Sequence, residues 1–390
     1  MAACVMKMGN LVLSNAVILA GEELEVTRGY LEIADGRVKK IAEGSPSGRA
    51  IDLKGGFVLP PFVNAHTHVA DAVAKELYLG RAQPQVVGPG GLKSKALASS
   101  PPSEMGSATR ATLRDMLQTG TLAHCDFREG GAAGVEVLRK NSAPPVKSLI
   151  LGRISKIGEL PKVLKKADGI GLPNIDAFAA GELGEISKRT LQMKKLLAVH
   201  VAETAGAQDG STKRTGMSEV ERAIELNCSF VVHGTHSSED DLSELKKNDI
   251  PLVFCPRANG ILGVGEPPIH AALDVGTEFF FGTDNAMVCQ PNMFAELSFA
   301  WACLRRANVG VASEEARQLL KAATLEPIEL FQLPWGPIAE GSRATFLVLS
   351  KGSNLSHLSD VYAGLVNRAR ADNIRAIYLD GKAVISQGKK

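Results

Sequence analysis

The stretch Pro60-Pro-Phe-Val-Asn-Ala-His-Thr-His68 decides the fold of this 390-residue chain. The apolar run over residues 56–63 predicts a buried strand, and two histidines follow where it ends. Alternate residues on a strand point to the same face, so His66 and His68 are placed to hold one ion together. The stretch therefore predicts a strand that carries a pair of imidazoles at its carboxyl end.

Later apolar runs end in the same way. His200, His233 and Asp284 each come directly after a run with the character of a buried strand. Imidazole nitrogens and a carboxylate oxygen, gathered from different strands, form a ligand set that divalent cations take in proteins. The sequence therefore predicts a divalent-metal site and, with it, a metal-dependent hydrolase.

Apolar runs alternate with helical patterns through the middle of the chain, which predicts βαβ units around a parallel sheet. Eight runs end near His66, Asp126, Arg153, Pro173, His200, His233, Cys255 and Asp284. Most are separated by the roughly 30 residues that one βα unit needs. We therefore expect a closed (β/α)8 TIM-like barrel over residues 61–336, in which the active site lies at the carboxyl ends of the strands.

Short β patterns at both ends of the chain predict a second domain. Asp35-Gly36 and Asp380-Gly381 mark tight hairpin turns between such patterns. The expected fold is therefore of the α/β class, with a barrel and with a small β-sandwich domain that residues 1–60 and 337–390 form together.

Composition narrows the classes of function. Hydrophobic residues make up 45% of the chain, which allows a sizeable core, and the formal net charge is only +2. No run of charge suited to nucleic acid or to a membrane surface is visible, so we expect a small-molecule substrate. Six cysteines without a Cys-x-x-Cys pair, no bilayer-length apolar run and no signal-peptide pattern at the start predict a cytoplasmic protein with reduced thiols.

Four further motifs follow the opening stretch in order: His200-Val-Ala-Glu203-Thr204, Val232-His233-Gly-Thr-His236, Cys255-Pro-Arg-Ala-Asn259 and Gly282-Thr-Asp284-Asn285. With these motifs the chain resembles the amidohydrolase superfamily, in the branch of cytosine, guanine and adenosylhomocysteine deaminases and related chlorohydrolases. The resemblance implies that His66, His68, His200 and Asp284 bind the metal. Three imidazoles and a carboxylate suit Zn²⁺, Fe²⁺ and Mn²⁺ alike; Zn²⁺ is favoured, with Fe²⁺ as the runner-up.

The number of ions follows from the fourth predicted strand. A two-metal branch of the superfamily bridges its ions with a carboxylated lysine or a glutamate from that strand. Here the strand reads Ala167-Asp-Gly-Ile-Gly-Leu-Pro173 and ends in neither residue. One divalent ion is therefore expected.

The resemblance also implies roles in a reaction. Glu203, three residues past His200, would shuttle protons and protonate the leaving nitrogen. A bound divalent ion lowers the pKa of a water molecule toward roughly 7, and Asp284 would accept the proton of that water. His233 would polarise the substrate. These roles predict an aminohydrolase, that is, a deaminase of an amino-substituted heterocycle such as a nucleobase, a nucleoside or a pterin.

Two alternatives stay open. The same ligand set serves hydrolysis of an amide, a cyclic amide or another carbon–heteroatom bond. The chain also departs from the deaminases, because it lacks their Trp-Leu segment after the first strand and has Cys255-Pro-Arg where they carry His-Asn-Pro. The second alternative is a non-catalytic barrel scaffold, although every ligand is present. The resemblance further suggests a homo-oligomer, commonly a dimer.

Substrate-binding residues are expected on the loops at the mouth of the barrel. Arg128 follows the second strand and offers a bidentate clamp for a carboxylate or phosphate, with a loop-holding Arg-Glu pair as the equal alternative. Arg257, Asn259 and Asn285 follow the seventh and eighth strands, where amides can read the edge of a heterocycle. The long Gly/Pro-rich loop over residues 80–103 is typical of a lid or a substrate loop.

Other polar groups have structural interpretations. His124, His236, His270 and His357 are interpreted as hydrogen-bonded core or surface residues, and Cys255 as a small buried group. Glu203 has an alternative as the cap of the following helix. Its fixed spacing from His200 favours catalysis instead.

Overall fold

The computed structural model describes residues 11–386, so the ends of the predicted β domain and Cys4 lie outside the described residues. The chain divides into two compact units. One unit comprises the chain up to Val63, Gln118–Leu122 and the chain from Ala312 onward, and the other comprises Asn64–Leu117 and Ala123–Val311. The domain limits at residues 60 and 337 stay a prediction.

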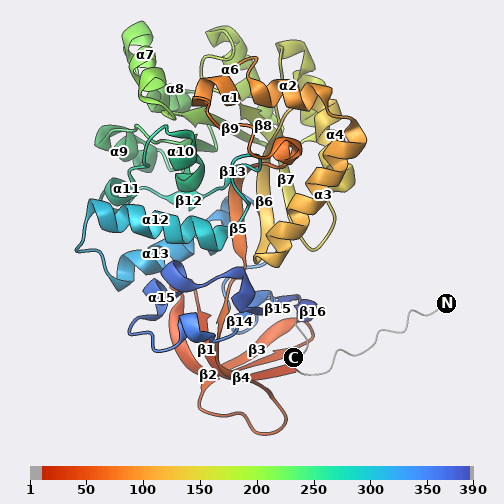
Figure 1. Cartoon of the computed structure of the whole chain (residues 1–390), viewed down its shortest axis with the longest axis vertical. Coiled ribbons are helices and arrows are strands. Elements are labelled where there is room, and N and C mark those ends of the chain that lie inside the picture. Colours follow the sequence, from red (N-terminus) through yellow and green to blue (C-terminus); the bar gives the residue numbers. More distant parts are fainter. Residues whose placement is uncertain (1–10, 387–390) are drawn as a thin grey trace, which may run out of the picture. The chain divides into compact units, whose positions relative to one another are not determined.

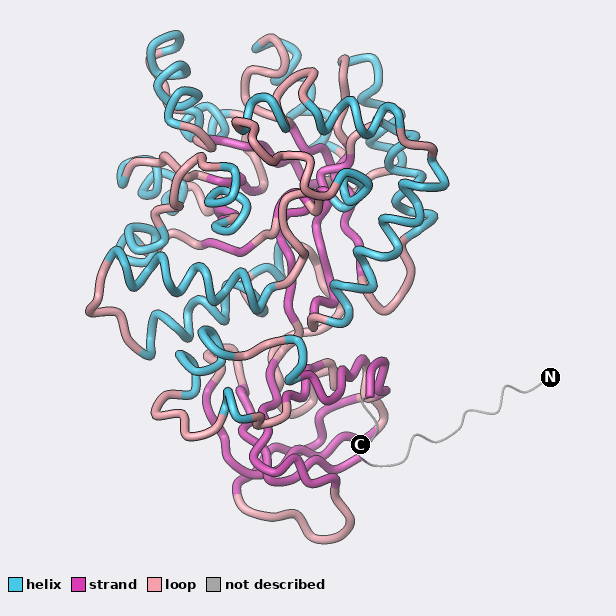
Figure 2. The backbone as a smooth tube through the Cα atoms, in the orientation of Figure 1, coloured by secondary structure: helices cyan, strands magenta, loops and turns pink. Residues whose placement is uncertain are grey.

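A parallel sheet forms the centre of the larger unit, and helices surround it (Figure 1, Figure 2). Its strands are β5 (Phe62–His68), β6 (Thr121–Arg128), β7 (Lys147–Gly152), β8 (Gly169–Leu172), β9 (Leu196–Val201), β10 (Phe230–His233), β11 (Leu252–Phe254), β12 (Phe279–Phe281) and β13 (Asp284–Asn285). Sequential strands lie side by side from β5 to β12. The strands therefore follow the chain order that repeated βα units require.

The last strand closes the sheet. Only Gly282 and Thr283 separate β12 from β13, and β13 pairs in parallel with β5, where Asp284 lies opposite Thr67. The eighth strand is thus made of two pieces, one paired with β11 and the other with the first strand. This order confirms the predicted (β/α)8 barrel.

The segments between the strands form helices because their buried residues recur at helical spacing. In α6, for example, Leu183, Ile186 and Thr190 are buried while the intervening positions are mostly exposed. The helices of this unit are α1 (Gln83–Val86), α2 (Leu92–Ser99), α3 (Pro102–Gln118), α4 (Gly131–Asn141), α5 (Leu160–Lys166), α6 (Ala180–Gln192), α7 (Ala205–Thr215), α8 (Glu219–Glu225), α9 (Glu239–Lys247), α10 (Pro256–Leu262), α11 (Ile269–Val275) and α12 (Met293–Ala307), with the 3-10 turns η1 (Val69–Ala74) and η2 (Ile157–Glu159).

The smaller unit holds a separate seven-stranded sheet built from both ends of the chain. Its order is β16 (Lys382–Ser386), β15 (Ile374–Leu379), β14 (Phe346–Leu349), β4 (Ile51–Leu59), β1 (Leu11–Ala20), β2 (Glu25–Ala34) and β3 (Arg37–Glu43). Helices α13 (Ser313–Thr324), α14 (Pro327–Leu330) and α15 (Val361–Arg368) and the 3-10 turns η3 (Ser353–Leu355) and η4 (Ala371–Asn373) complete it.

One apolar core holds this sheet together. Val38 of β3 and Tyr378 of β15 lie far apart in the strand order, yet both belong to a single buried cluster with Phe346 of β14. The sheet therefore folds over its own core. The two predicted hairpin turns are present, because Asp35-Gly36 and Asp380-Gly381 adopt left-handed backbone between paired antiparallel strands. Within residues 11–386, none of the helices combines the length and apolar character needed to cross a bilayer.

Gly282 marks the closest approach inside the barrel. A Cβ atom at this position would lie 2.7 Å from His66 Cβ and 2.8 Å from His66 N. We expect Gly282→Ala to lower the free energy of unfolding by about 1–3 kcal/mol, because the added methyl must push two packed strands apart. Thermal or urea denaturation measures the loss.

Gly184→Ala is the matched control for that substitution. Gly184 is an exposed residue inside α6, and a Cβ there meets no atom within 4 Å. This control is expected to leave stability unchanged or to raise it by about 0.4–1 kcal/mol. Equal stability of the two variants would contradict the packing argument.

Candidate metal centre and active site

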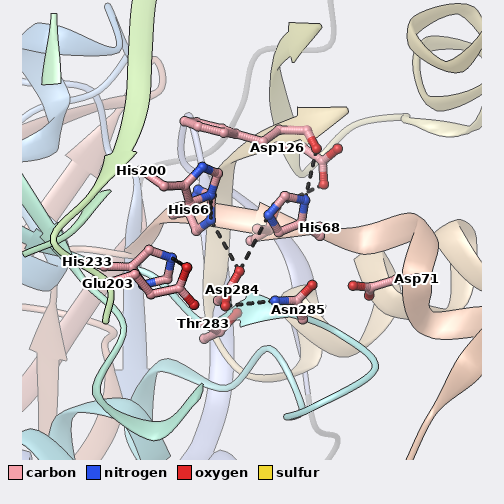
Figure 3. Close-up of polar contacts among 12 residues, drawn as sticks. His66, His68, Asp71, Asp126, His200, Glu203, His233, Thr283, Asp284 and Asn285 are labelled. Carbon is pink, nitrogen blue, oxygen red and sulfur yellow. Dashed lines mark hydrogen bonds and ion pairs between the residues drawn. The ribbon is translucent and has the colours of Figure 1, made fainter. Parts of the chain in front are cut away.

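The predicted ligands converge at the carboxyl ends of the barrel strands. His66 and His68 end β5, His200 lies near the end of β9, His233 ends β10 and Asp284 begins β13. All five residues are buried or nearly so. Figure 3 shows their side chains pointing toward one another from separate strands. The barrel thus brings together residues that lie more than 200 positions apart in the sequence.

The donor atoms face one another at short distances. His66 Nε2 lies 3.2 Å from Asp284 Oδ1 and 3.3 Å from His200 Nε2, and His68 Nε2 lies 3.5 Å from the same Asp284 oxygen. Two overlapping groups in the described part of the chain have the spacing of metal ligands: His66, His200 and His233, and His66, His68 and Asp284. His66 belongs to both groups and stands at their centre.

Backbone carbonyls set the tautomers of two imidazoles. His68 Nδ1 lies 2.9 Å from the carbonyl oxygen of Phe127, and His200 Nδ1 lies 2.9 Å from that of Leu172. A carbonyl only accepts, so each Nδ1 carries the proton and donates it. Each Nε2 therefore keeps a free lone pair, which is how histidine ligands are oriented in metal sites.

Burial keeps these imidazoles neutral. It lowers the pKa of His66 to about 4 and that of His68 to about 3, and it lowers the pKa of His200 well below its usual range. Burial acting alone would raise the pKa of Asp284, but its hydrogen bond with His66 holds that pKa well below its ordinary value. Neutral nitrogens and an ionised carboxylate are the protonation states that bind Zn²⁺ or Fe²⁺, so the residues present fit such an ion.

His233 and Asp284 both have left-handed backbone, which sets the direction of their side chains. His233 has φ of 77° and Asp284 has φ of 56°, a region that non-glycine residues seldom adopt. Asn64 fixes the junction before Asp284: its amide donates to Thr283 Oγ1 at 2.7 Å and accepts from Thr283 N at 3.0 Å. Strain of this kind is commonly held at functional sites by the surrounding packing.

Glu203 lies on the loop between β9 and α7, beside His233. Its Oε2 is 3.9 Å from His233 Nε2, and Gln83 Nε2 donates to its Oε1 at 2.8 Å. The cap of α7 is Thr204, whose hydroxyl accepts from Ala207 N, so Glu203 is not needed for that purpose. The carboxylate is therefore directed to the site and not to the helix.

A cavity of about 580 Å³ opens onto these groups. His68, His200, Glu203, His233, Asp284 and Asn285 line it together with Gln83 and Lys93 of the long loop, Arg153, Asn174 and Phe178. Its volume lies in the range of small-molecule sites, and its wall combines an aromatic face with a few polar groups. The predicted loop over residues 80–103 thus contributes directly to the cavity, although the structure shows that it contains α1 and α2.

The four predicted substrate-binding residues are placed differently from one another. Asn285 lines the cavity, whereas Arg128 is 3% exposed and is not among the lining residues. Arg257 forms an ion pair with Glu296 and donates to the carbonyl of Gln290. Asn259 Oδ1 lies 3.1 Å from His233 Nδ1, so it orients that imidazole through the ring nitrogen that does not face Glu203.

Several residues at the site escaped sequence analysis. Gln83 and Lys93 belong to the predicted lid or substrate loop over residues 80–103, which predicts no role for either residue, and Arg153 is predicted only as the end of a strand. Glu129 follows Arg128 directly, yet it contacts His68 Nδ1 at 2.9 Å. A charged residue in a Gly/Pro-rich segment at a barrel mouth is the one sequence signal that could have drawn attention to Lys93.

Buried carboxylates elsewhere in the site hold backbone groups. Asp126 Oδ2 accepts from Val69 N at 2.7 Å, and Asp71 Oδ1 accepts from Met287 N at 3.0 Å. Burial raises the pKa of Asp126 to about 6 and that of Asp71 to about 8. These carboxylates fix the turn η1 that leaves the first barrel strand.

The other histidines and cysteines lie apart from the ligand cluster. His124 contacts Thr67 Oγ1 at 3.0 Å, His236 contacts a carbonyl, His270 pairs with Asp274, and His357 is exposed. The cysteines of the described residues are free and buried, and burial raises the pKa of Cys255 well above its usual range. The Cys255 thiol therefore stays protonated and is no nucleophile.

Comparisons with known proteins agree with this architecture. The family model described as "Amidohydrolase family" matches residues 57–384. A protein of Methanothermobacter thermautotrophicus named "Putative aminohydrolase" is 35% identical, covering 97% of this chain and 100% of that protein. The 5-methylthioadenosine/S-adenosylhomocysteine deaminase of Pyrococcus furiosus is 25% identical, covering 97% and 96%. The crystal structure of an adenosine deaminase from Xanthomonas campestris with bound zinc superposes with a TM-score of 0.83 at 16% identity, covering 97% and 93%.

Proposed function

Because the chain belongs to the amidohydrolase family, we propose that it is a metal-dependent aminohydrolase that removes an amino group from a nitrogen heterocycle. The observation that carries the proposal is the convergence on His66 Nε2, which lies 3.2 Å from Asp284 Oδ1 and 3.3 Å from His200 Nε2. Relatives named as deaminases support the class of reaction. A nucleobase, a nucleoside or a pterin is the proposed substrate class.

One divalent ion is proposed at this cluster, held by His66, His68, His200 and Asp284. When bound, such an ion supplies Lewis-acid activation of water at neutral pH. Zn²⁺ is favoured, with Fe²⁺ as the runner-up, because the donor set suits both and a structural neighbour contains zinc. Strand β8 offers no lysine or glutamate that would bridge a second ion.

We assign the proton transfers and the polarisation of the substrate to three residues of the chain. Asp284 is ionised and its Oδ1 faces the ligand cluster, so it accepts the proton of the attacking water. His233 Nε2 faces the cavity beside Glu203 and polarises the ring nitrogen or the carbon under attack. Glu203 in its protonated form delivers a proton to the leaving amino group, which departs as ammonia, and the proton taken up by Asp284 restores the protonated form of Glu203.

The lining of the cavity supports a planar, polar substrate. Phe178 and Ile154 provide apolar surface, while Arg153, Asn174 and Asn285 provide donors and acceptors. A cytoplasmic location is supported by the free, buried cysteines of the described residues. The predicted homodimer stays a prediction.

Ammonia release tests the proposal. We expect the Zn²⁺- or Fe²⁺-loaded protein to release ammonia from one class within a panel of aminopurines, aminopyrimidines, aminopterins and their nucleosides. Hydrolysis of amides or cyclic amides with no ammonia from any heterocycle would replace the proposal with the second candidate reaction. A protein that binds no metal and stays fully stable would favour the scaffold interpretation.

A further inference from the structure

Lys93 is a buried lysine that reaches the ligand cluster from the long loop. It belongs to α2, it is only 5% exposed, and it lines the cavity. Lysines are almost never buried to this extent unless they are paired. Here the ammonium donates to Asn285 Oδ1 at 2.8 Å and forms an ion pair with Glu129 Oε1 at 2.7 Å, while Asp71 Oδ2 lies 3.5 Å away.

The contact with Asn285 controls the orientation of a metal ligand. Since Asn285 Oδ1 accepts from Lys93, the amide cannot flip, and its Nδ2 points toward Asp284. That nitrogen donates to Asp284 Oδ2 at 2.7 Å. The other oxygen, Asp284 Oδ1, is thereby left facing His66 and His68.

The contact with Glu129 links Lys93 to a second proposed ligand, His68. Glu129 Oε1 lies 2.7 Å from Lys93 Nζ and 2.9 Å from His68 Nδ1. The negative charge of Glu129 beside Nδ1 favours the proton on that nitrogen, which donates it to the Phe127 carbonyl, and Nε2 is left free to bind an ion. Arg153, whose Nη1 is 3.6 Å from the same oxygen, is a weaker neighbour of Glu129.

We propose that Lys93 is a positioning residue that holds His68 and Asp284 together in the orientation that binds the metal, so that the 80–103 loop is a structural part of the metal centre. The proposal rests on the metal site of the proposed function. It does not require Lys93 to touch the substrate. A lysine that merely anchored α2 would affect stability and leave metal affinity unchanged.

Metal affinity of Lys93→Met tests the proposal. Methionine keeps most of the length of the side chain and removes the ammonium. We expect Zn²⁺ affinity, measured by competition with a chromophoric chelator, to fall by about 10- to 100-fold, as it does when a hydrogen-bond partner of a ligand is lost. The visible spectrum of the Co²⁺-loaded protein should change as well, because two ligands lose their fixed orientation.

Lys95→Met is the matched control. Lys95 lies on the same helix two residues further on and is exposed. This variant should keep the wild-type Zn²⁺ affinity and Co²⁺ spectrum. Circular dichroism shows whether each variant is folded before its affinity is interpreted.

Two further variants test separately the contact that leads to Asp284 and the contact that leads to His68. Asn285→Ala removes the link to Asp284, and Glu129→Gln weakens the link to His68. Each is expected to lower Zn²⁺ affinity, and adding Lys93→Met to either should cost less than it costs in the wild type, because the contacts act as one unit. Should Lys93→Met fail to fold, these two variants decide the question.

The outcomes distinguish failure of the positioning role from failure of the proposed metal site. Wild-type Zn²⁺ affinity in Lys93→Met, or in both Asn285→Ala and Glu129→Gln, would overturn the positioning role while leaving the deaminase proposal intact. Absence of metal binding by the wild-type protein would overturn the proposed metal site and the positioning role together. Full additivity of the double variants would show that Lys93 does not act through Asn285 or Glu129.

Discussion

Replacing Glu203 with glutamine is expected to lower kcat for ammonia release by about 10²- to 10⁴-fold, the range that a positioned proton donor contributes. The leaving amino group must gain a proton before the carbon–nitrogen bond breaks. Glu203 lines the cavity, and its Oε2 lies 3.9 Å from His233 Nε2. An amide of the same shape fills the same space but cannot transfer that proton.

The substitution should leave the rest of the site unchanged. Gln83 Nε2 donates to Glu203 Oε1, and an amide oxygen at that position still accepts. The following helix keeps its cap, because Thr204 provides it. Metal content and unfolding temperature are therefore expected to equal those of the wild type, and the loss should fall on kcat.

Steady-state kinetics and metal analysis of both proteins provide the measurement. Glu225→Gln, the same chemical change at an exposed position of α8, is the control and should retain wild-type kinetics. A Glu203→Gln enzyme with normal kcat would assign the proton transfer to another group. Loss of metal from this variant would instead show that Glu203 supports the ligands.

Replacing Asp284 with asparagine is expected to remove both metal binding and activity. Its ionised Oδ1 lies 3.2 Å from His66 Nε2 and 3.5 Å from His68 Nε2. The amide has no charge for the cation and accepts no proton from the attacking water. The fall in Zn²⁺ affinity should exceed the about 10- to 100-fold that follows loss of a ligand's hydrogen-bond partner.

Chelator competition and residual ammonia release measure these two losses. Asp274→Asn, which changes an aspartate of α11 whose side chain is 67% exposed, is the control and should match the wild type. Retained Zn²⁺ affinity with lost activity would limit Asp284 to proton acceptance. Retention of both would exclude it from the centre.

Local sequence patterns were sufficient to predict the barrel and the strand ends where the proposed ligands lie. Strands of a parallel sheet are buried on both faces, so their apolar runs are continuous and easily recognised. His66, His200 and Asp284 each stand where such a run ends, and the topology of the fold collects strand ends at one mouth. Position in the chain therefore predicted position in space.

Contacts across loops were not predictable in the same way. Arg128 and Arg257 end strands or follow them as the ligands do, yet the first is buried and the second pairs with Glu296. Whether a loop side chain faces the cavity depends on packing against segments far away in the sequence. Strand periodicity contains no information on that packing.

The sequence by itself determined the class of fold, the family resemblance and the residues proposed to bind the metal, because each depends on residue types and on their places at the ends of successive strands. Only the tertiary structure decided that Lys93 and Gln83 reach the site, that Asn259 stands behind His233, and that Glu129 contacts His68. These contacts join segments whose approach is fixed by barrel closure and loop packing. Such distances arise only after the chain has folded.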